Sequence, residues 1–313
     1  MSDRIETQFI DTGAVRFEVD TAGDQSSERL ALLLHGFPES SFSWRHQLPM
    51  LADLGYKVWA PNQRGYGKTT RYSRISDYRL ELLVDDVARL IDASGCKSVT
   101  LIAHDWGGIV GWYAVLSSIR SFERFIVMNL PHPKRMSEGL RTWAQLRRSW
   151  YVFFFQIPGL PETLLRLDGA RAVGRAIHDM AVDKSRFPDE VLAVHMRKAA
   201  QPGATRAMVN WYRAALRTGS HFQRLAESPP LLETPTLMIW GEQDVALGKE
   251  LTYGTDKLVK YFTLRYLPGV SHWVQQEAPE AVNAMIEAWL TGKPVPEAGW
   301  GGKLKLDGLG LGA

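Results

Sequence analysis

The chain has 313 residues, of which 45% are hydrophobic and 23% charged, with a net charge of +3, as in an ordinary soluble globular protein. The basic residues are scattered rather than gathered in a run, which argues against nucleic acid or an anionic membrane as a partner. A single cysteine, Cys96, excludes an intramolecular disulfide. Because the start is polar and no apolar stretch reaches membrane length, we expect a cytoplasmic protein without a membrane span.

The predicted elements begin with VRFEVD, residues 15–20, whose strict alternation predicts a half-buried strand in an antiparallel hairpin. LALLLHG, residues 30–36, is a continuous apolar run closed by glycine, as expected of a strand buried on both faces. Residues 78–95 have a helical period, and Gly95 ends that helix. Further strand-like runs are KVWAPN (57–62), SVTLIAHD (98–105), FIVMNLPHP (125–133), PTLMIWGEQD (235–244) and FTLRYLPGVSH (262–272). Strands that alternate with helices predict an α/β fold with an open, mostly parallel sheet.

The middle of the chain breaks this alternation. Residues 133–229 lack strand-like runs and are basic, aromatic and helix-rich, which predicts a helical cap inserted into an α/β core. The core would comprise residues 1–132 and 230–291, with the amphipathic segment 279–290 packed on the sheet. Residues 292–313 are glycine-rich without a sustained period, and we expect a poorly ordered tail there.

Asp105 interrupts an otherwise apolar region. In TLIAHDWGG, residues 100–108, a strand is followed by a turn with two glycines and then by a helix. This spacing matches the nucleophile elbow G-x-S-x-G, with Asp105 in place of the serine and Ala103 in place of the first glycine. An unpaired buried carboxylate is costly, so its presence here predicts a nucleophile. Taken alone, an aspartate at this position is more often a helix N-cap than a nucleophile.

Several motifs occur together in order: HGFPESSFSWRHQ, RGYGKT, HDWGG, NWYR and GVSHW. From about residue 10 to residue 290, the chain resembles the α/β-hydrolase superfamily, specifically its epoxide hydrolase branch. This resemblance implies a mostly parallel central sheet flanked by helices, with an inserted helical cap. It also implies that a carboxylate attacks the sp3 carbon of an epoxide and that water then hydrolyses the alkyl-enzyme ester to a vicinal diol.

The resemblance also implies roles for other residues. His272 corresponds to the base that activates water, and Asp244 to the acid that orients it, in the order typical of the fold. Some relatives carry this acid at a position where this chain has Asn129, and an asparagine cannot act as the acid. The oxyanion hole would consist of the backbone N–H groups of Phe37 and Trp106.

Two tyrosines are expected to act on the epoxide oxygen. Epoxide hydrolases place one tyrosine five residues before the glutamine of an aromatic F-Q-x-P segment, and Tyr151 has this spacing to Gln156. The second lies in an N-W-Y motif, where this chain has Tyr212. A phenol can donate a hydrogen bond and then its proton to the opening ring. The aromatic cap suggests an apolar, aryl-substituted epoxide as the small-molecule substrate.

Other functions share parts of this pattern. A haloalkane or haloacid dehalogenase has the same nucleophile, but simple haloalkane enzymes tend to carry a polar residue at Phe37. Haloacetate enzymes have arginines at the positions of Trp106 and Ile109, and tryptophan at that of Tyr151. A ligand-binding receptor on a hydrolase scaffold would not need His272 and the tyrosines. A lipase or esterase is disfavoured by the missing serine.

Several remaining polar residues are expected to be structural. We expect His104 to pack or hydrogen-bond beneath the elbow, His35 to brace the oxyanion loop and Arg64 to anchor its own loop. Asn62 stands where relatives often have aspartate, which puts local salt bridging in doubt. The peptide bond between Phe37 and Pro38 is a candidate for the cis form. No metal or cofactor is expected, because the other histidines lack metal-ligand spacing: His46, His132, His178, His195 and His221.

Overall fold

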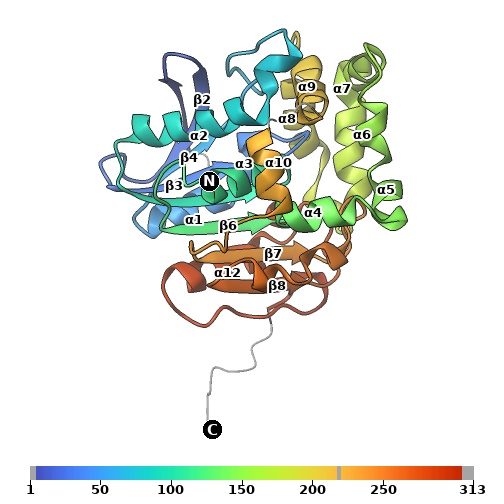
Figure 1. The fold of residues 1–313 in the computed structure, drawn as a ribbon. Coiled ribbons are helices and arrows are strands. Elements are labelled where there is room, and N and C mark those ends of the chain that lie inside the picture. The colour runs from blue at the N-terminus through green and yellow to red at the C-terminus, as the bar shows by residue number, and fades with distance from the viewer. Residues whose placement is uncertain (1–4, 217–219, 305–313) are drawn as a thin grey trace.

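The computed structural model describes residues 5–216 and 220–304. Its strands form one eight-stranded sheet in the order β1-β2-β4-β3-β5-β6-β7-β8 (Figure 1). The strands are β1 (Glu6–Asp11), β2 (Arg16–Ala22), β3 (Arg29–Leu34), β4 (Lys57–Pro61), β5 (Ser98–His104), β6 (Arg124–Met128), β7 (Thr236–Gly241) and β8 (Phe262–Leu267). The β1–β2 and β2–β4 pairs are antiparallel, and the other neighbours are parallel. The predicted hairpin and the mostly parallel sheet are confirmed.

Helices cover both faces of the sheet. One hydrophobic core contains residues of α2 (Leu80–Ser94) and α3 (Trp106–Leu116), and the other contains residues of α1 (Gln47–Asp53) and α12 (Pro279–Leu290). Because side chains alternate along a strand, Leu101 of β5 belongs to the first core while Ile102 belongs to the second. Burial on both faces explains why these strands are continuous apolar runs in the sequence.

The cap lies between β6 and β7. Within the described part of this segment there is no named strand, and the helices are α4 (Pro133–Gly139), α5 (Trp143–Arg148), α6 (Trp150–Phe154), α7 (Leu160–Met180), α8 (Asp189–Ala199), α9 (Ala204–Ala215) and α10 (Ser220–Glu227). Figure 1 shows α5 to α9 gathered beside one end of the sheet. The inserted helical cap is thus confirmed, while the exact domain boundaries stay a prediction.

Two of the hydrogen bonds between the cap and the core involve indole groups. The indole N–H of Trp211 on α9 donates to the carbonyl of Arg64 at 3.1 Å. The indole N–H of Trp273 donates to the carbonyl of Ile177 on α7, also at 3.1 Å. Both indoles are buried, so these bonds satisfy donors that would otherwise be costly. They fix the cap over the ends of the core strands.

The last part of the chain packs more closely than expected. On α12, Val282, Met285 and Ile286 are buried, as the helical period predicts. Val295 and Leu304 pack on the same core, and Arg265 donates to the carbonyl of Val295 at 2.9 Å. The expectation of a poorly ordered tail is therefore wrong for residues 292–304, and residues 305–313 lie outside the described residues. Across the described helices, none has the length and apolarity needed to cross a membrane.

Candidate active site

The turn between β5 and α3 carries Asp105. Asp105 has φ 48° and ψ −122°, a strained conformation for a residue with a side chain. The neighbouring glycines allow the close approach: a Cβ on Gly107 would lie 2.2 Å from the carbonyl oxygen of Leu34, and one on Gly36 would lie 2.5 Å from Asp105 Cβ. The side chain of Asp105 makes no capping hydrogen bond to α3, so the N-cap interpretation fails. The strained turn instead presents the carboxylate beyond the strand end.

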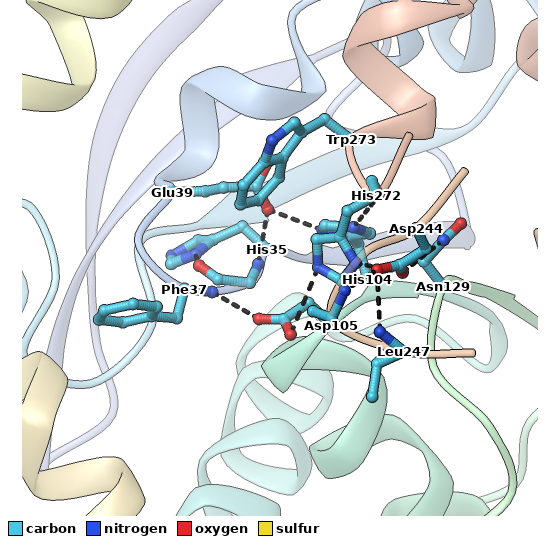
Figure 2. Close-up of polar contacts among 12 residues, drawn as sticks. His35, Phe37, Glu39, His104, Asp105, Asn129, Asp244, Leu247, His272 and Trp273 are labelled. Atoms are coloured by element: carbon cyan, nitrogen blue, oxygen red, sulfur yellow. Dashed lines mark hydrogen bonds and ion pairs between the residues drawn. The ribbon is translucent and has the colours of Figure 1, made fainter. Parts of the chain in front are cut away.

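Two groups hold this carboxylate (Figure 2). The backbone N–H of Phe37 donates to Asp105 Oδ1 at 2.7 Å, and His272 Nε2 lies 3.5 Å from Asp105 Oδ2. The Phe37–Pro38 peptide is cis, as predicted. Trp106 is the first residue of α3, where backbone N–H groups lack helical partners. Both backbone donors predicted for an oxyanion hole therefore lie beside Asp105, one of them already bonded to it.

His272 lies between two carboxylates. Its Nδ1 is 2.6 Å from Asp244 Oδ2, and both side chains are buried. Burial lowers the pKa of His272, but Asp244 and Asp105 outweigh this effect and raise the pKa to about 10. Burial likewise raises the pKa of Asp244, but His272 and hydrogen bonds from its neighbours hold that pKa below its usual value. At neutral pH the geometry therefore favours an imidazolium between two carboxylates.

Asn129 supports this pair, a role that the sequence patterns do not indicate. Its side-chain amide donates to Asp244 Oδ2 at 2.8 Å, and its Oδ1 accepts from the backbone N–H of Gly241 at 2.9 Å. The backbone N–H groups of Ala246 and Leu247 donate to the other carboxylate oxygen, at 2.8 and 2.9 Å. Two signals point to this position: Asn129 follows a core strand, where polar side chains often reach a site, and some relatives carry the orienting acid there.

A second buried pair lies behind His272. Glu39 Oε2 is 2.8 Å from His104 Nδ1, and His104 Nε2 is 2.9 Å from the carbonyl oxygen of His272. Burial raises the pKa of Glu39, but His104 outweighs this effect and lowers the pKa to about 2. The two ring nitrogens of His104 thus connect the carboxylate of Glu39 to the backbone of His272. His104 thus lies beneath the elbow as expected, whereas the sequence patterns do not point to Glu39.

A cavity of about 370 Å³ opens above Asp105, between core and cap. Tyr151 of α6 and Tyr212 of α9 line it together with Asp105 and His272, and the two tyrosine rings are 5.9 Å apart. Burial, aided by the charge of Asp105, raises the pKa of both phenols above its usual value. Both tyrosines therefore stay protonated at neutral pH and can donate to a molecule in the cavity.

Most of the remaining cavity wall is apolar. It includes Phe37, Trp150, Phe155, Leu165, Met180 and Trp273. Within the aromatic run at the end of α6, Phe155 lines the cavity whereas Phe153 is exposed. A carboxylate, an imidazolium and two phenols within apolar walls suit nucleophilic attack on an apolar molecule whose leaving oxygen needs a proton.

Other residues singled out from the sequence have structural contacts. Arg64 forms a bidentate pair with Asp86 at 2.7 and 2.6 Å. Asn62 donates to Glu18 at 2.8 Å and accepts from the backbone N–H of Ser41 at 3.1 Å, so its amide makes hydrogen bonds in place of a salt bridge. His35 accepts from the backbone N–H of Gln63 at 3.1 Å, beside the oxyanion loop. Over residues 5–216 and 220–304, no group of His, Cys, Asp and Glu is arranged to hold a metal ion.

Comparisons with known proteins agree with this architecture. The family model described as "alpha/beta hydrolase fold" matches residues 32–279. The AB hydrolase superfamily protein YfhM of Bacillus subtilis is 36% identical over 289 residues, which cover 92% of this chain and 99% of that protein. Epoxide hydrolase 4 of Mus musculus is 36% identical over 287 residues, covering 90% of this chain and 78% of that protein. A Bacillus megaterium epoxide hydrolase, solved with an inhibitor, superposes with a TM-score of 0.82 at 27% identity, over 91% of this chain and 100% of that one.

Proposed function

Because the chain belongs to the α/β-hydrolase family, in its epoxide hydrolase branch, we propose that it converts apolar epoxides to vicinal diols through an ester at Asp105. One observation carries this proposal: the Asp105 carboxylate and two protonated phenols, Tyr151 and Tyr212, line the same apolar cavity. A carboxylate is already anionic at neutral pH, so it needs no base for in-line attack on an sp3 carbon. The phenols supply what an opening epoxide needs, which is a proton for its oxygen.

In the first step, a carboxylate oxygen of Asp105 forms a bond to one ring carbon. The electron pair of the broken C–O bond moves to the ring oxygen, which takes a proton from Tyr151 or Tyr212 while the other phenol donates a hydrogen bond. The raised pKa of both phenols keeps them protonated until this moment. The imidazolium of His272 then gives its proton to restore the phenol. The negative charge of Asp105 and the positive charge of His272 are thus lost together, and the net charge of the site does not change.

In the second step, the ester changes the electrostatics around His272. Asp105 has lost its negative charge, so only Asp244 still raises the pKa of His272, and the ring gives up its proton more readily. Neutral His272 removes a proton from water, which attacks the carboxyl carbon of Asp105. The backbone N–H groups of Phe37 and Trp106 stabilise the resulting oxyanion. Collapse of this intermediate breaks the bond between the carboxyl carbon and the diol oxygen, which leaves with the remaining proton of the water, so that Asp105 ends as a carboxylate and His272 as an imidazolium.

Diol formation tests this proposal. The purified protein is incubated with styrene oxide, cyclohexene oxide or a fatty-acid epoxide, and the diol is measured over many turnovers. Asp179→Asn is a matched control for the Asp105→Ala variant, because Asp179 lines the same cavity without contacting His272 in the described structure. We expect the control to turn over an epoxide and Asp105→Ala to be inactive. A burst limited to one equivalent of diol would favour a receptor, and no diol from any epoxide would contradict the proposal.

A further inference from the structure

The outer side of the cap exposes large apolar side chains. Trp143 on α5 is 75% exposed, and on α6 Trp150 is 64% and Phe153 62% exposed. We call this surface the cap patch and define it by Trp143, Trp150, Phe153, Ile157, Leu160 and Leu164. Figure 1 shows α5, α6 and α7 along one edge of the molecule. Isolated apolar side chains are common on protein surfaces, but six exposed ones between residues 143 and 164, on neighbouring elements, point to a binding surface.

Most of the charges around the cap patch that lack an ion-pair partner are positive. Between Glu138 and Glu162 the sequence contains arginines but no aspartate or glutamate. Arg141 and Arg147 in this interval are exposed, and so is Arg166 beyond it. Glu138 and Glu162 themselves pair with Arg135 and Arg213, at the two ends of the interval. The arginines are spaced along short helices and therefore form no basic run in the sequence. The patch is thus apolar, with a positive rim.

We propose that the cap patch binds the surface of an anionic lipid bilayer. Tryptophan and phenylalanine side chains favour the boundary between headgroups and acyl chains, and arginines favour anionic headgroups. Since none of the described helices can span a membrane, α5 and α6 lie on the bilayer rather than cross it. The positive rim favours a bilayer over a second copy of the chain as the partner. In a dimer the arginines of two cap patches would repel each other, whereas anionic headgroups would attract them.

The cap patch adjoins the cavity above Asp105. Trp150 belongs to both, because its ring is largely exposed and also lines the cavity. Leu165 lines the cavity from α7, beside Leu164 of the patch. An apolar epoxide dissolved in a bilayer would therefore reach the cavity mouth without crossing water. The delivery of an epoxide from the bilayer to the cavity rests on the proposed function. The binding of the cap patch to the bilayer does not.

Co-sedimentation with vesicles tests the proposal without measuring activity. The probes are vesicles of phosphatidylcholine alone and of phosphatidylcholine mixed with phosphatidylglycerol. We expect the wild type to bind the anionic vesicles, and Trp143→Ser/Phe153→Ser to bind them at least about 10-fold more weakly, because two large apolar side chains are lost. Arg141→Gln and Arg147→Gln should each weaken binding to anionic vesicles by about 5-fold. Added salt should have a similar effect.

Two controls match these variants. Trp300→Ser removes a tryptophan that is 69% exposed outside the cap, and Arg197→Gln removes an exposed arginine elsewhere in the cap. Both should bind as the wild type does, and circular dichroism checks that every variant is folded. Equal binding by the wild type and Trp143→Ser/Phe153→Ser would overturn the proposal. The proposal would also be overturned if the wild type did not bind vesicles but formed a dimer, and if Trp143→Ser converted this dimer to a monomer. The cap patch would then be an interface between two copies of the chain.

Discussion

His272 Nε2 lies 3.5 Å from Asp105 Oδ2, while Nδ1 of the same ring lies 2.6 Å from Asp244 Oδ2. One buried imidazole is therefore shared by two carboxylates, which together raise its pKa to about 10. Under the proposed mechanism this sharing is temporary, because the ester at Asp105 carries no charge. The chemical state of Asp105 thus controls whether His272 is an acid or a base.

Removal of the nucleophile is the first prediction. Asp105→Ala should lower kcat for epoxide hydrolysis by at least about 10⁴-fold, because no other carboxylate is held in its place. Alanine at φ 48° is no less strained and leaves the backbone N–H of Phe37 without its acceptor, so we expect the variant to fold but to be slightly less stable than the wild type. Steady-state diol formation and thermal unfolding measure the two effects. Full activity in a folded Asp105→Ala protein would disprove the nucleophile assignment.

The second prediction concerns a trapped intermediate. His272→Gln should still form the ester but should not hydrolyse it, because the base acts only in the second step. Intact mass spectrometry should then show an increase equal to the mass of the epoxide, located by digestion in the peptide that contains Asp105. As a control, His178→Gln removes a half-exposed histidine of the cap and should turn over normally. An unmodified His272→Gln protein that still binds substrate would assign His272 to the first step.

The third prediction concerns the tyrosines. Tyr151→Phe and Tyr212→Phe each remove one hydroxyl and little volume, and each should slow ester formation by about 10-fold to 1000-fold. The double variant should be slower still, because the alkoxide would form among apolar walls without a donor. Hydrolysis of the ester should change much less. Stopped-flow kinetics with a chromogenic epoxide separates the two phases.

The same variants discriminate an epoxide from a halide substrate. A halide leaving group needs no proton, so a 1-bromoalkane of similar size should not lose rate when the two hydroxyls are removed. The wild type should prefer the epoxide. If it instead prefers the bromide, the protein is a dehalogenase. If the double variant opens epoxides at the wild-type rate, Tyr151 and Tyr212 do not act on the epoxide oxygen.

The fourth prediction follows from the raised pKa of His272. The pKa of His272 is higher in the folded state than in the unfolded chain, so its extra proton stabilises the fold. This contribution is fully present below about pH 6.5, the pKa of histidine in an unfolded chain. This contribution should decline as the pH rises from there and should be gone above about pH 10. The difference in Tm between the wild type and His272→Gln should therefore shrink over this range. A difference that stays constant from pH 6 to about pH 10 would show that His272 does not bind the extra proton.

The sequence predicts the sheet and the convergence of the site for the same physical reason. Asp105, Asp244 and His272 each follow a parallel strand, and parallel strands end at one edge of a sheet. Side chains that follow such strands must therefore lie near one another, however far apart they are in the chain. The resemblance adds Tyr151 and Tyr212, which no periodicity would identify.

What the sequence does not predict depends on tertiary contacts. Glu39 and Asn129 acquire their roles only from the buried partners that the fold brings to them, His104 and Asp244. The kink in α7 is only partly predictable: Asp168-Gly169 is a turn-forming pair, but alanine carries no signal for the φ of 65° at Ala170. The cap patch escapes notice because its arginines and aromatic residues are spaced among polar and buried positions.

A single turnover in water enriched in ¹⁸O tests the central claim, the ester at Asp105, most directly. The wild-type protein is held in excess over an epoxide, and both the diol and the peptide that contains Asp105 are analysed by mass spectrometry. If Asp105 attacks, the first diol carries an unlabelled oxygen from the carboxylate, and the peptide gains ¹⁸O from water. If the first diol contains ¹⁸O and the peptide stays unlabelled, water attacks the epoxide directly and the ester does not form.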